Sequence, residues 1–398
     1  MKLSIKLAYR NLIGAGLRTW LNVFVLSFVY ILIIWHYGVL DGWNQQAKKD
    51  MTEWEVGNGQ YWQKNYDPYD FFTLEESHAA IPEKLKPGIS EGTITPILIH
   101  QGTVYPEGRI QSMLLKGIDV NQNVISVPSE YLNIKSEAMP AGRQEIPVII
   151  GRRMAKSCKL KEGDVTTIRW RDANGTFDAL EIKIAHVFHC NVPNVDAGIM
   201  WIALNDLQEM TQSPNEATIF IADKDFELIE NIDGWIYKDF DFLMAEINEM
   251  MKMKKVGGSV FYIILILLAM LAIFDTQVLS IFRRQKEIGT YIAMGMTRAQ
   301  VVSLFTVEGA MHAILAVILG AIYGIPFLLW QIKIGFTMPA GTDDMGIAIA
   351  ETVFPVYGAG LIITTVLLVL IITTIVSYMP ARKISKMKPT DAIKGKIQ

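Results

Sequence analysis

Residues 260–281 read VFYIILILLAMLAIFDTQVLSI, a run of apolar side chains whose only charge is Asp275. Three further runs of this kind cover residues 20–40, 301–330 and 356–379. A helix that rises ~1.5 Å per residue needs about 20 apolar residues to cross a hydrocarbon core of ~30 Å. The sequence therefore predicts four membrane helices, in agreement with its 51% of hydrophobic residues and its mean hydropathy of +0.26.

Charge is divided unevenly between the segments that these runs separate. Residues 1–19, 282–300 and 380–398 together hold 14 basic and 2 acidic residues, whereas residues 41–255 hold 22 basic and 33 acidic ones. Lys and Arg beside membrane helices stay preferentially in the cytoplasm. The pattern predicts that both termini are cytoplasmic and that residues 41–255 form a domain outside the membrane.

The expected fold is a membrane α-helical protein with four transmembrane helices and a large extracytoplasmic α/β domain inserted between helices 1 and 2. The predicted segments are a cytoplasmic amphipathic helix (1–19), a first membrane helix (20–40), the outer domain with its stalk helices (41–255), a second membrane helix (256–281), a cytoplasmic helix or loop (282–300), a third membrane helix (301–330), a short outer loop (331–355), a fourth membrane helix (356–379) and a basic cytoplasmic tail (380–398). The first apolar run is too long for the core of a signal peptide, so we expect it to be retained. The residues before it suit either an amphipathic helix at the inner headgroup level or a solvated basic leader.

The outer block shows the mixed signals of an α/β domain. Strands are expected where β-branched and aromatic residues lie between turn formers, at residues 93–99, 111–118, 147–150, 165–170, 179–188, 199–203 and 218–222. Helices are expected at 152–158, 204–210 and 241–254. The last helix is predicted to continue as a stalk into the second membrane helix, with Gly257 and Gly258 as a candidate hinge, and the first membrane helix is predicted to continue through Trp43 and Lys48.

No catalytic motif is present in the sequence. Phosphate-binding loops, zinc-protease helices, nucleophile elbows and paired cysteines at redox spacing are all missing. His186 and His189 would face opposite sides of a strand, so we expect no metal site. Cys158 and Cys190 fall in the outer domain and could be bonded or free, which their spacing does not decide. The chain is expected to be a non-catalytic subunit that binds no cofactor.

Residues 283–308, RRQKEIGTYIAMGMTRAQVVSLFTVE, resemble the signature that follows the second membrane helix in ABC-transporter permeases of the FtsX, MacB and LolC/LolE superfamily. The residues that carry this resemblance are Glu287, Ile288, Gly289, Gly295, Arg298 and Glu308. Three further segments resemble the same superfamily in the same order: LAYRNLIGAGLRT (7–19), GRRMAKSCKLKEGD (151–164) and PARKISKMKPTDAIK (380–394).

The resemblance implies that residues 283–298 dock onto a separate ATPase subunit and pass its movements to the membrane helices. The residues assigned to this coupling are Arg283, Arg284, Lys286, Glu287, Ile288, Gly289, Gly295 and Arg298. The alternative is a membrane anchor whose basic side chains face anionic headgroups. If the coupling role is correct, reversing the charge of Glu287 should uncouple ATP hydrolysis from transport.

Polar and small residues within the apolar runs form a second set of candidates. A lone carboxylate such as Asp275 is expensive in the bilayer, so we expect it to face protein or water. Glu308 and His312 lie four residues apart and could satisfy each other, and a structural contact between helices is favoured over substrate binding. Gly320 and Gly324 permit close helix packing, either within the chain or at a dimer seam.

Three functions are compatible with the resemblance. The leading one is release of lipoproteins from the outer leaflet of the bacterial inner membrane, as in the LolC/LolE branch, where Trp35, Tyr37 and Trp43 could flank an acyl-chain entry site or form an ordinary aromatic belt. The alternatives are MacB-type efflux of macrolides, peptides or other cargo, and FtsX-like signalling to a cell-wall hydrolase. The implied partners are an ABC ATPase that holds ATP and Mg, a second permease as a homodimer or heterodimer, the lipid bilayer, and a periplasmic lipoprotein carrier or a membrane-fusion protein. No nucleic-acid partner is expected.

Overall fold

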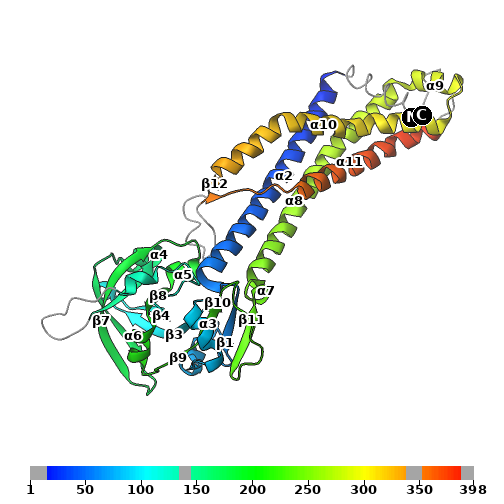
Figure 1. Ribbon diagram of the computed structural model, residues 1–398. Helices are drawn as coiled ribbons and strands as arrows, with labels where there is room; N and C mark the ends of the chain where they lie inside the picture. Colours follow the sequence, from blue (N-terminus) through cyan, green and yellow to red (C-terminus); the bar gives the residue numbers. More distant parts are fainter. Residues whose placement is uncertain (1–15, 134–144, 338–351, 387–398) are drawn as a thin grey trace. The chain divides into compact units, whose positions relative to one another are not determined.

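The computed structural model describes residues 16–133, 145–337 and 352–386 (Figure 1). The leader expected at 1–19 and the tail expected at 380–398 therefore lie largely outside the described residues. Within them, four helices are long and apolar enough to cross a membrane. These helices are α2 (Leu17–Met51), α8 (Ala245–Arg283), α10 (Arg298–Ile334) and α11 (Ala359–Ala381). The four predicted membrane helices are thus confirmed.

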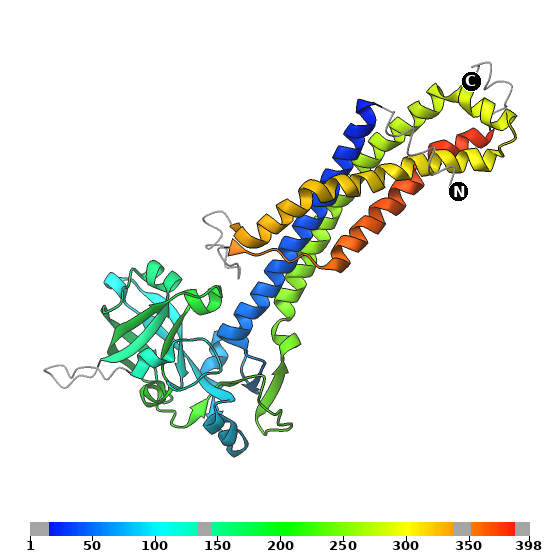
Figure 2. The same ribbon diagram turned by 45° about the horizontal axis from the view of Figure 1, so that its top comes forward.

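The long helices pack around a shared apolar core. Figures 1 and 2 both show α2 running beside α8. The core is formed by Val23, Leu26 and Ile33 of α2, Ile266, Met270 and Ile273 of α8, Ala313 and Ala316 of α10, and Val369 of α11. Polar contacts also join α2 to α8: Asn22 Nδ2 donates to Thr276 Oγ1 at 2.6 Å, and Lys255 Nζ lies 2.6 Å from Asp41 Oδ1. The Asn22–Thr276 bond lies among apolar residues, where such a contact fixes the register of two helices.

Both predicted stalks are present as continuations of membrane helices. Helix α2 runs without a break past Trp43 and Lys48 and ends in a single π-helical turn at Thr52–Val56. The helix expected at 241–254 is divided, because α7 (Phe240–Leu243) ends at the buried Met244 and α8 begins one residue later. Helix α8 is continuous through Gly257 and Gly258, so any bending there would have to occur within a regular helix.

The outer domain is built on one large sheet that closes on itself. Its long strands are β1 (Gly59–Gln63), β3 (Ile94–Val104), β4 (Gln111–Ile118), β5 (Ile146–Gly151), β6 (Val165–Arg171), β7 (Phe177–Phe188), β8 (Ile199–Ala203), β10 (Ile219–Ala222) and β11 (Trp235–Asp239). The order β3-β4-β8-β5-β7-β6 returns to β3 through a β3–β6 pairing and closes a barrel. The first half of β3 pairs instead with β10, which continues through β1 to β11 as an arm.

Period-two alternation explains how this sheet buries two cores. In β6, Ile168 and Trp170 point into the barrel while Thr167 and Arg169 point outward. In β8, Met200 and Ile202 face the barrel interior, whereas Ile199 and Trp201 face a second core on the outer surface of the barrel. Strands β5 and β8 therefore contribute to a core on both of their faces, as their near-continuous apolar runs require, whereas β6 contributes on one face only.

Several short elements complete the described part of the chain. The helices are α3 (Lys86–Glu91), α4 (Arg152–Cys158), α5 (Pro193–Ala197) and α6 (Leu204–Thr211), and two pairs of very short strands are β2 (Ala79–Ala80) with β9 (Glu216–Ala217) and β12 (Phe336–Thr337) with β13 (Thr352–Val353). Cys158 lies in the barrel core and Cys190 in the second core, and both are free thiols. Burial raises the pKa of the Cys190 thiol to about 12.

Candidate functional site

The segment that joins α8 to α10 forms a helix and a tight turn. Helix α9 spans Gln285–Ala293 and lies at one end of the helical unit (Figure 1). Gly295 follows in the left-handed region at φ +99°, a conformation that favours glycine. Thr297 then caps α10: its Oγ1 accepts from the Gln300 amide at 3.3 Å, and its own amide donates to Gln300 Oε1 at 2.8 Å. The chain therefore reverses at a defined point.

Helix α9 is attached to the other helices by a buried apolar face. Ile288 is fully buried, and Gly289 beside it is buried too. The apolar cluster around them contains Ile281 of α8, Val301, Val302 and Phe305 of α10, Ala381 at the end of α11, and Ile384 in the 3-10 turn that follows it. Burial of a side chain of this size contributes about 1.5–3 kcal/mol, so α9 is held firmly against three helix ends.

A buried ion pair adds a second attachment. Arg284 Nη1 lies 2.9 Å from both carboxylate oxygens of Glu308, and the two side chains are only 17% and 7% exposed. Arg284 Nε also donates to Glu287 Oε2 at 2.8 Å, and the guanidinium lies 4.9 Å from the centre of the Phe305 ring. We name this group, Arg284 with Glu287, Phe305 and Glu308, the arginine clamp.

The clamp revises two expectations. The sequence places Arg284 among the basic residues expected to meet an ATPase or lipid headgroups. Its side chain is instead directed into the protein, because it pairs with the buried carboxylate of Glu308. The pairing of Glu308 with the His312 side chain is not formed. Instead, His312 Nδ1 lies 3.2 Å from the backbone oxygens of Glu308 and Gly309.

The outward face of the segment is basic with an apolar tip. Arg283, Lys286 and Arg298 are exposed, and Glu287 is about half exposed while it contacts Arg284. Met294 is 69% exposed immediately before Gly295. Met294 is not among the residues predicted from the sequence. The signal that could have indicated it is its position directly before a turn glycine in a basic segment. An exposed methionine in a segment with several exposed cations is suited to a protein partner that offers an apolar socket and acidic side chains.

The intramembrane candidates separate into packed and unpacked residues. Gly324 packs on α2, since a Cβ there would lie 2.1 Å from Ile31 Cδ1, and Gly320 faces Ser27 at 3.6 Å. This pair therefore serves packing within the chain. Asp275 is exposed on α8, and within the described parts of the chain it makes no polar contact. The bilayer cost of a bare carboxylate implies that water or another subunit covers it in the membrane.

The aromatic residues of α2 are engaged within the protein. Trp43 is buried beneath the Lys254 ammonium at 3.7 Å, Tyr37 shares a 2.6 Å hydrogen bond with Ser259, and the Trp35 ring packs edge-on against Phe336 at 5.8 Å. These contacts favour a structural role for the three residues over an open acyl-chain entrance.

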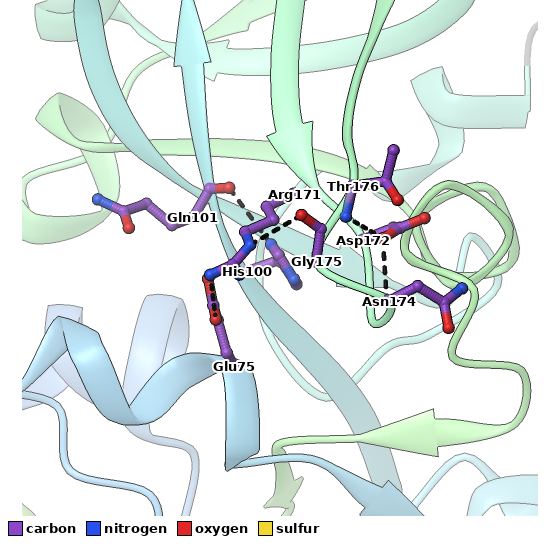
Figure 3. Close-up of polar contacts among 8 residues, drawn as sticks. All are labelled: Glu75, His100, Gln101, Arg171, Asp172, Asn174, Gly175 and Thr176. Carbon is purple, nitrogen blue, oxygen red and sulfur yellow. Dashed lines mark hydrogen bonds and ion pairs between the residues drawn. The ribbon is translucent and has the colours of Figure 1, made fainter.

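A separate polar cluster lies beside the β6–β7 hairpin of the outer domain. Figure 3 shows Arg171 joined to Glu75 at 2.9 Å and to the backbone oxygen of Gly175 at 3.1 Å. Asp172 Oδ1 accepts from the backbone amides of Asn174 and Thr176 at 2.9 and 2.7 Å. These contacts complete the turn between β6 and β7 and connect it to the 3-10 helix Phe71–Glu76, which contains Glu75. The cluster therefore has a structural role.

His186 of the outer domain is engaged in local contacts. His186 Nδ1 lies 2.7 Å from Glu162 Oε1, and its ring stacks on Tyr131 at 4.1 Å. Among the residues whose positions are described, no group of three or more His, Cys, Asp or Glu side chains could hold a metal ion.

The C-terminal membrane helices match a known family, and most of the chain is similar to known membrane proteins. Residues 259–389 match the family described as FtsX-like permease C-terminal. The chain is 19% identical over 308 residues to the lipoprotein-releasing system transmembrane protein LolC of Xylella fastidiosa strain 9a5c, a match that covers 72% of this chain and 74% of that protein. The LolC protein of strain Temecula1 matches to the same extent. Residues 259–389 therefore form an FtsX-like permease C-terminal domain within a multi-pass membrane protein, and the distant similarity to LolC is consistent with the FtsX, MacB and LolC/LolE permease superfamily.

Proposed function

We propose that this ABC permease couples a separate ATPase subunit to its outer domain through α9 and the arginine clamp, and that its activity is the release of lipoproteins from the bacterial inner membrane. In this proposal the basic face and Met294 contact the ATPase, and the clamp transfers the displacement of α9 to α8 and α10. The chain itself carries out no hydrolysis. ATP and Mg belong to the partner.

The arginine clamp is the observation that carries the coupling part of the proposal. A helix attached only by exposed charges would move without its neighbours, whereas α9 is fixed by a buried ion pair to Glu308 of α10 and by Ile288 to the cluster that includes Ile281 of α8. Buried packing is dense and resists deformation. Because α8 is one continuous helix from Ala245 to Arg283, a displacement at its inner end is carried along its length.

Lipoprotein release is supported by the extent of the match to LolC. The matched 72% of the chain is more than the C-terminal segment 259–389 can supply, so the similarity reaches into the preceding residues, which include the outer domain. Efflux with a membrane-fusion partner remains the alternative that an experiment must separate, because both activities would use the same coupling segment.

The coupling role is tested by placing a charge on the apolar tip. The full-length Met294→Glu variant should lose its co-purifying ABC ATPase, because burying an unpaired carboxylate in an apolar socket is costly. Met253 has a similar exposure of 71%, and Met253→Glu is the matched control that should retain the ATPase. Equal recovery of the ATPase with both variants would reject the assignment of Met294.

The transport role requires a second measurement. Proteoliposomes that hold the permease, its co-purified ATPase and a lipid-anchored reporter protein should release the reporter on addition of ATP, and only when a soluble carrier is present. The Met294→Glu complex should not release it. Co-purification of a membrane-fusion protein, with no ATP-dependent release, would instead support efflux.

A further inference from the structure

The outer domain contains a large cleft whose wall includes a buried cation. The cleft has a volume of about 1360 Å³ and is lined entirely by residues between Met51 and Glu246. Its walls come from the turn after α2, the loop after β1, strands β4 and β11, and the loop before β8. Small-molecule sites commonly occupy 300–1,000 Å³, so this cleft can hold a sizeable ligand.

Lys116 is directed toward this cleft by the alternation of β4. Met113 and Leu115 point into the barrel, so Lys116, the next residue, points out of it. Lys116 is only 8% exposed. Its ammonium lies 5.5 Å from the centre of the Trp201 ring, and within the described residues it makes no hydrogen bond or ion pair.

An unpartnered ammonium is an unusual group to bury in a folded domain. Burial lowers the pKa of Lys116, and the charge of Glu55 opposes that shift. The contact with the face of Trp201 stabilises the cation, but it leaves the three N–H donors of the ammonium unused. The Glu55 carboxylate is close enough for its charge to act on Lys116, but it forms no hydrogen bond or ion pair with the ammonium, so these donors still lack an acceptor among the described residues.

Two further orphaned polar atoms lie in the same region. Glu55 Oε2 and Trp201 Nε1 are buried, and neither has a hydrogen-bond partner in the described part of the chain. The remainder of the wall is aromatic: Trp62 packs edge-on against Tyr66 at 5.2 Å and against Phe242 at 6.0 Å. The cleft thus combines a small polar end with an apolar surface, as ligand sites generally do.

We propose that this cleft binds a small amphipathic anion, with its carboxylate or phosphate on the Lys116 ammonium and its apolar body against Trp62, Tyr66 and Phe242. Charge-assisted hydrogen bonds from a buried donor are the strong ones. The site lies in the outer domain and is independent of the ATPase-coupling segment, so the proposal stands whichever cargo the permease moves.

Binding is tested on the full-length protein in lipid nanodiscs by titration calorimetry. The probes are phenylbutyrate, phenylbutyl phosphate and the uncharged phenylbutanol, which share one apolar body. Both anions should bind, and the alcohol should bind at least about tenfold more weakly because it lacks the charge. The tighter of the two anions identifies the anionic group that the cleft prefers. Equal binding of all three probes would overturn the proposal.

Variants separate binding from folding. Lys116→Met keeps the length of the side chain and should remove the preference for anions, whereas Lys116→Arg should retain it. Lys183→Met alters an exposed lysine of the same barrel and should change nothing. Lys116→Met should also raise the thermal stability of the protein, because it removes an unpaired buried charge. Unchanged anion binding by a folded Lys116→Met variant would show that Lys116 has only a structural role.

Discussion

Arg284 is the residue whose position most changes the interpretation of the coupling segment. It belongs to a run of basic side chains that any surface could display, yet it is bound to Glu308 and Glu287 and packs over Phe305. A buried ion pair contributes little to stability compared with an apolar pair of the same volume, but the loss of one partner leaves the other charge uncompensated. The proposed coupling through Arg284 therefore depends on both members of the pair.

We expect Arg284→Met and Glu308→Met each to lower the free energy of unfolding by about 3–5 kcal/mol, and the double variant to recover most of that loss. Thermal unfolding of the purified full-length protein, followed by circular dichroism, measures both effects. Arg283→Met is the matched control, because Arg283 is exposed and should change stability by less than about 0.5 kcal/mol. Additive losses in the double variant would contradict a direct interaction.

The long helices are positioned by glycines that admit close approach. Along α2, Gly38 and Gly42 form a second pair with four-residue spacing, which our sequence reading did not identify. The Val356 amide donates to the Gly38 oxygen at 2.9 Å, and a Cβ on Gly42 would lie 2.0 Å from the backbone oxygen of Phe354. By contrast, a Cβ on Gly257 of α8 would meet nothing within 4 Å. These glycines therefore serve different purposes.

Alanine substitution should separate the two purposes. Gly42→Ala should lower stability by about 1–3 kcal/mol, because the backbone that opposes it cannot rotate away. Gly257→Ala should raise stability by about 0.5–1 kcal/mol through helix propensity, and it should slow transport if the proposed hinge operates. Unfolding and ATP-dependent release are measured on the same preparations. A Gly257→Ala variant that transports at the normal rate would exclude the hinge.

The complete chain consists of a helical unit and an outer domain that differ in charge as well as in fold. Residues 44–249 make up nearly all of one compact unit, and the long helices make up the other. Residues 44–249 fall within the acidic stretch 41–255. The three strongly basic segments, 1–19, 282–300 and 380–398, follow or precede the other ends of the predicted membrane helices in the sequence. This asymmetry is the basis of the proposed orientation.

Cysteine labelling in intact cells should test the orientation. A membrane-impermeant maleimide should label Lys183→Cys on the barrel, while Lys286→Cys in α9 should react only after the membrane is permeabilised. Both lysines are exposed, and the native Cys158 and Cys190 are buried, so the background should be low. Labelling of Lys286→Cys before that of Lys183→Cys would reverse the proposed topology.

Local sequence patterns predicted the membrane helices and most of the long strands. Apolar runs of about 20 residues predicted all four membrane helices, and the segments 111–118, 199–203 and 152–158 match β4, β8 and α4 at both ends. These signals are local, because a helix or a strand places its side chains with a fixed period. Strands β1 and β11 were missed, since they are short and owe their existence to pairing with each other and with β10, far away in sequence.

The closed barrel, the arginine clamp and the cleft at Lys116 were decided only by the tertiary structure. The local sequence of β3 does not predict that its last part pairs with β6. Similarly, a basic residue that will be buried cannot be told from an exposed one by the sequence pattern alone. Arg284 and Lys116 are buried because strands and helices distant in the chain cover them. The sequence alone determined which segments enter the membrane, since that depends on the composition of each segment rather than on its neighbours.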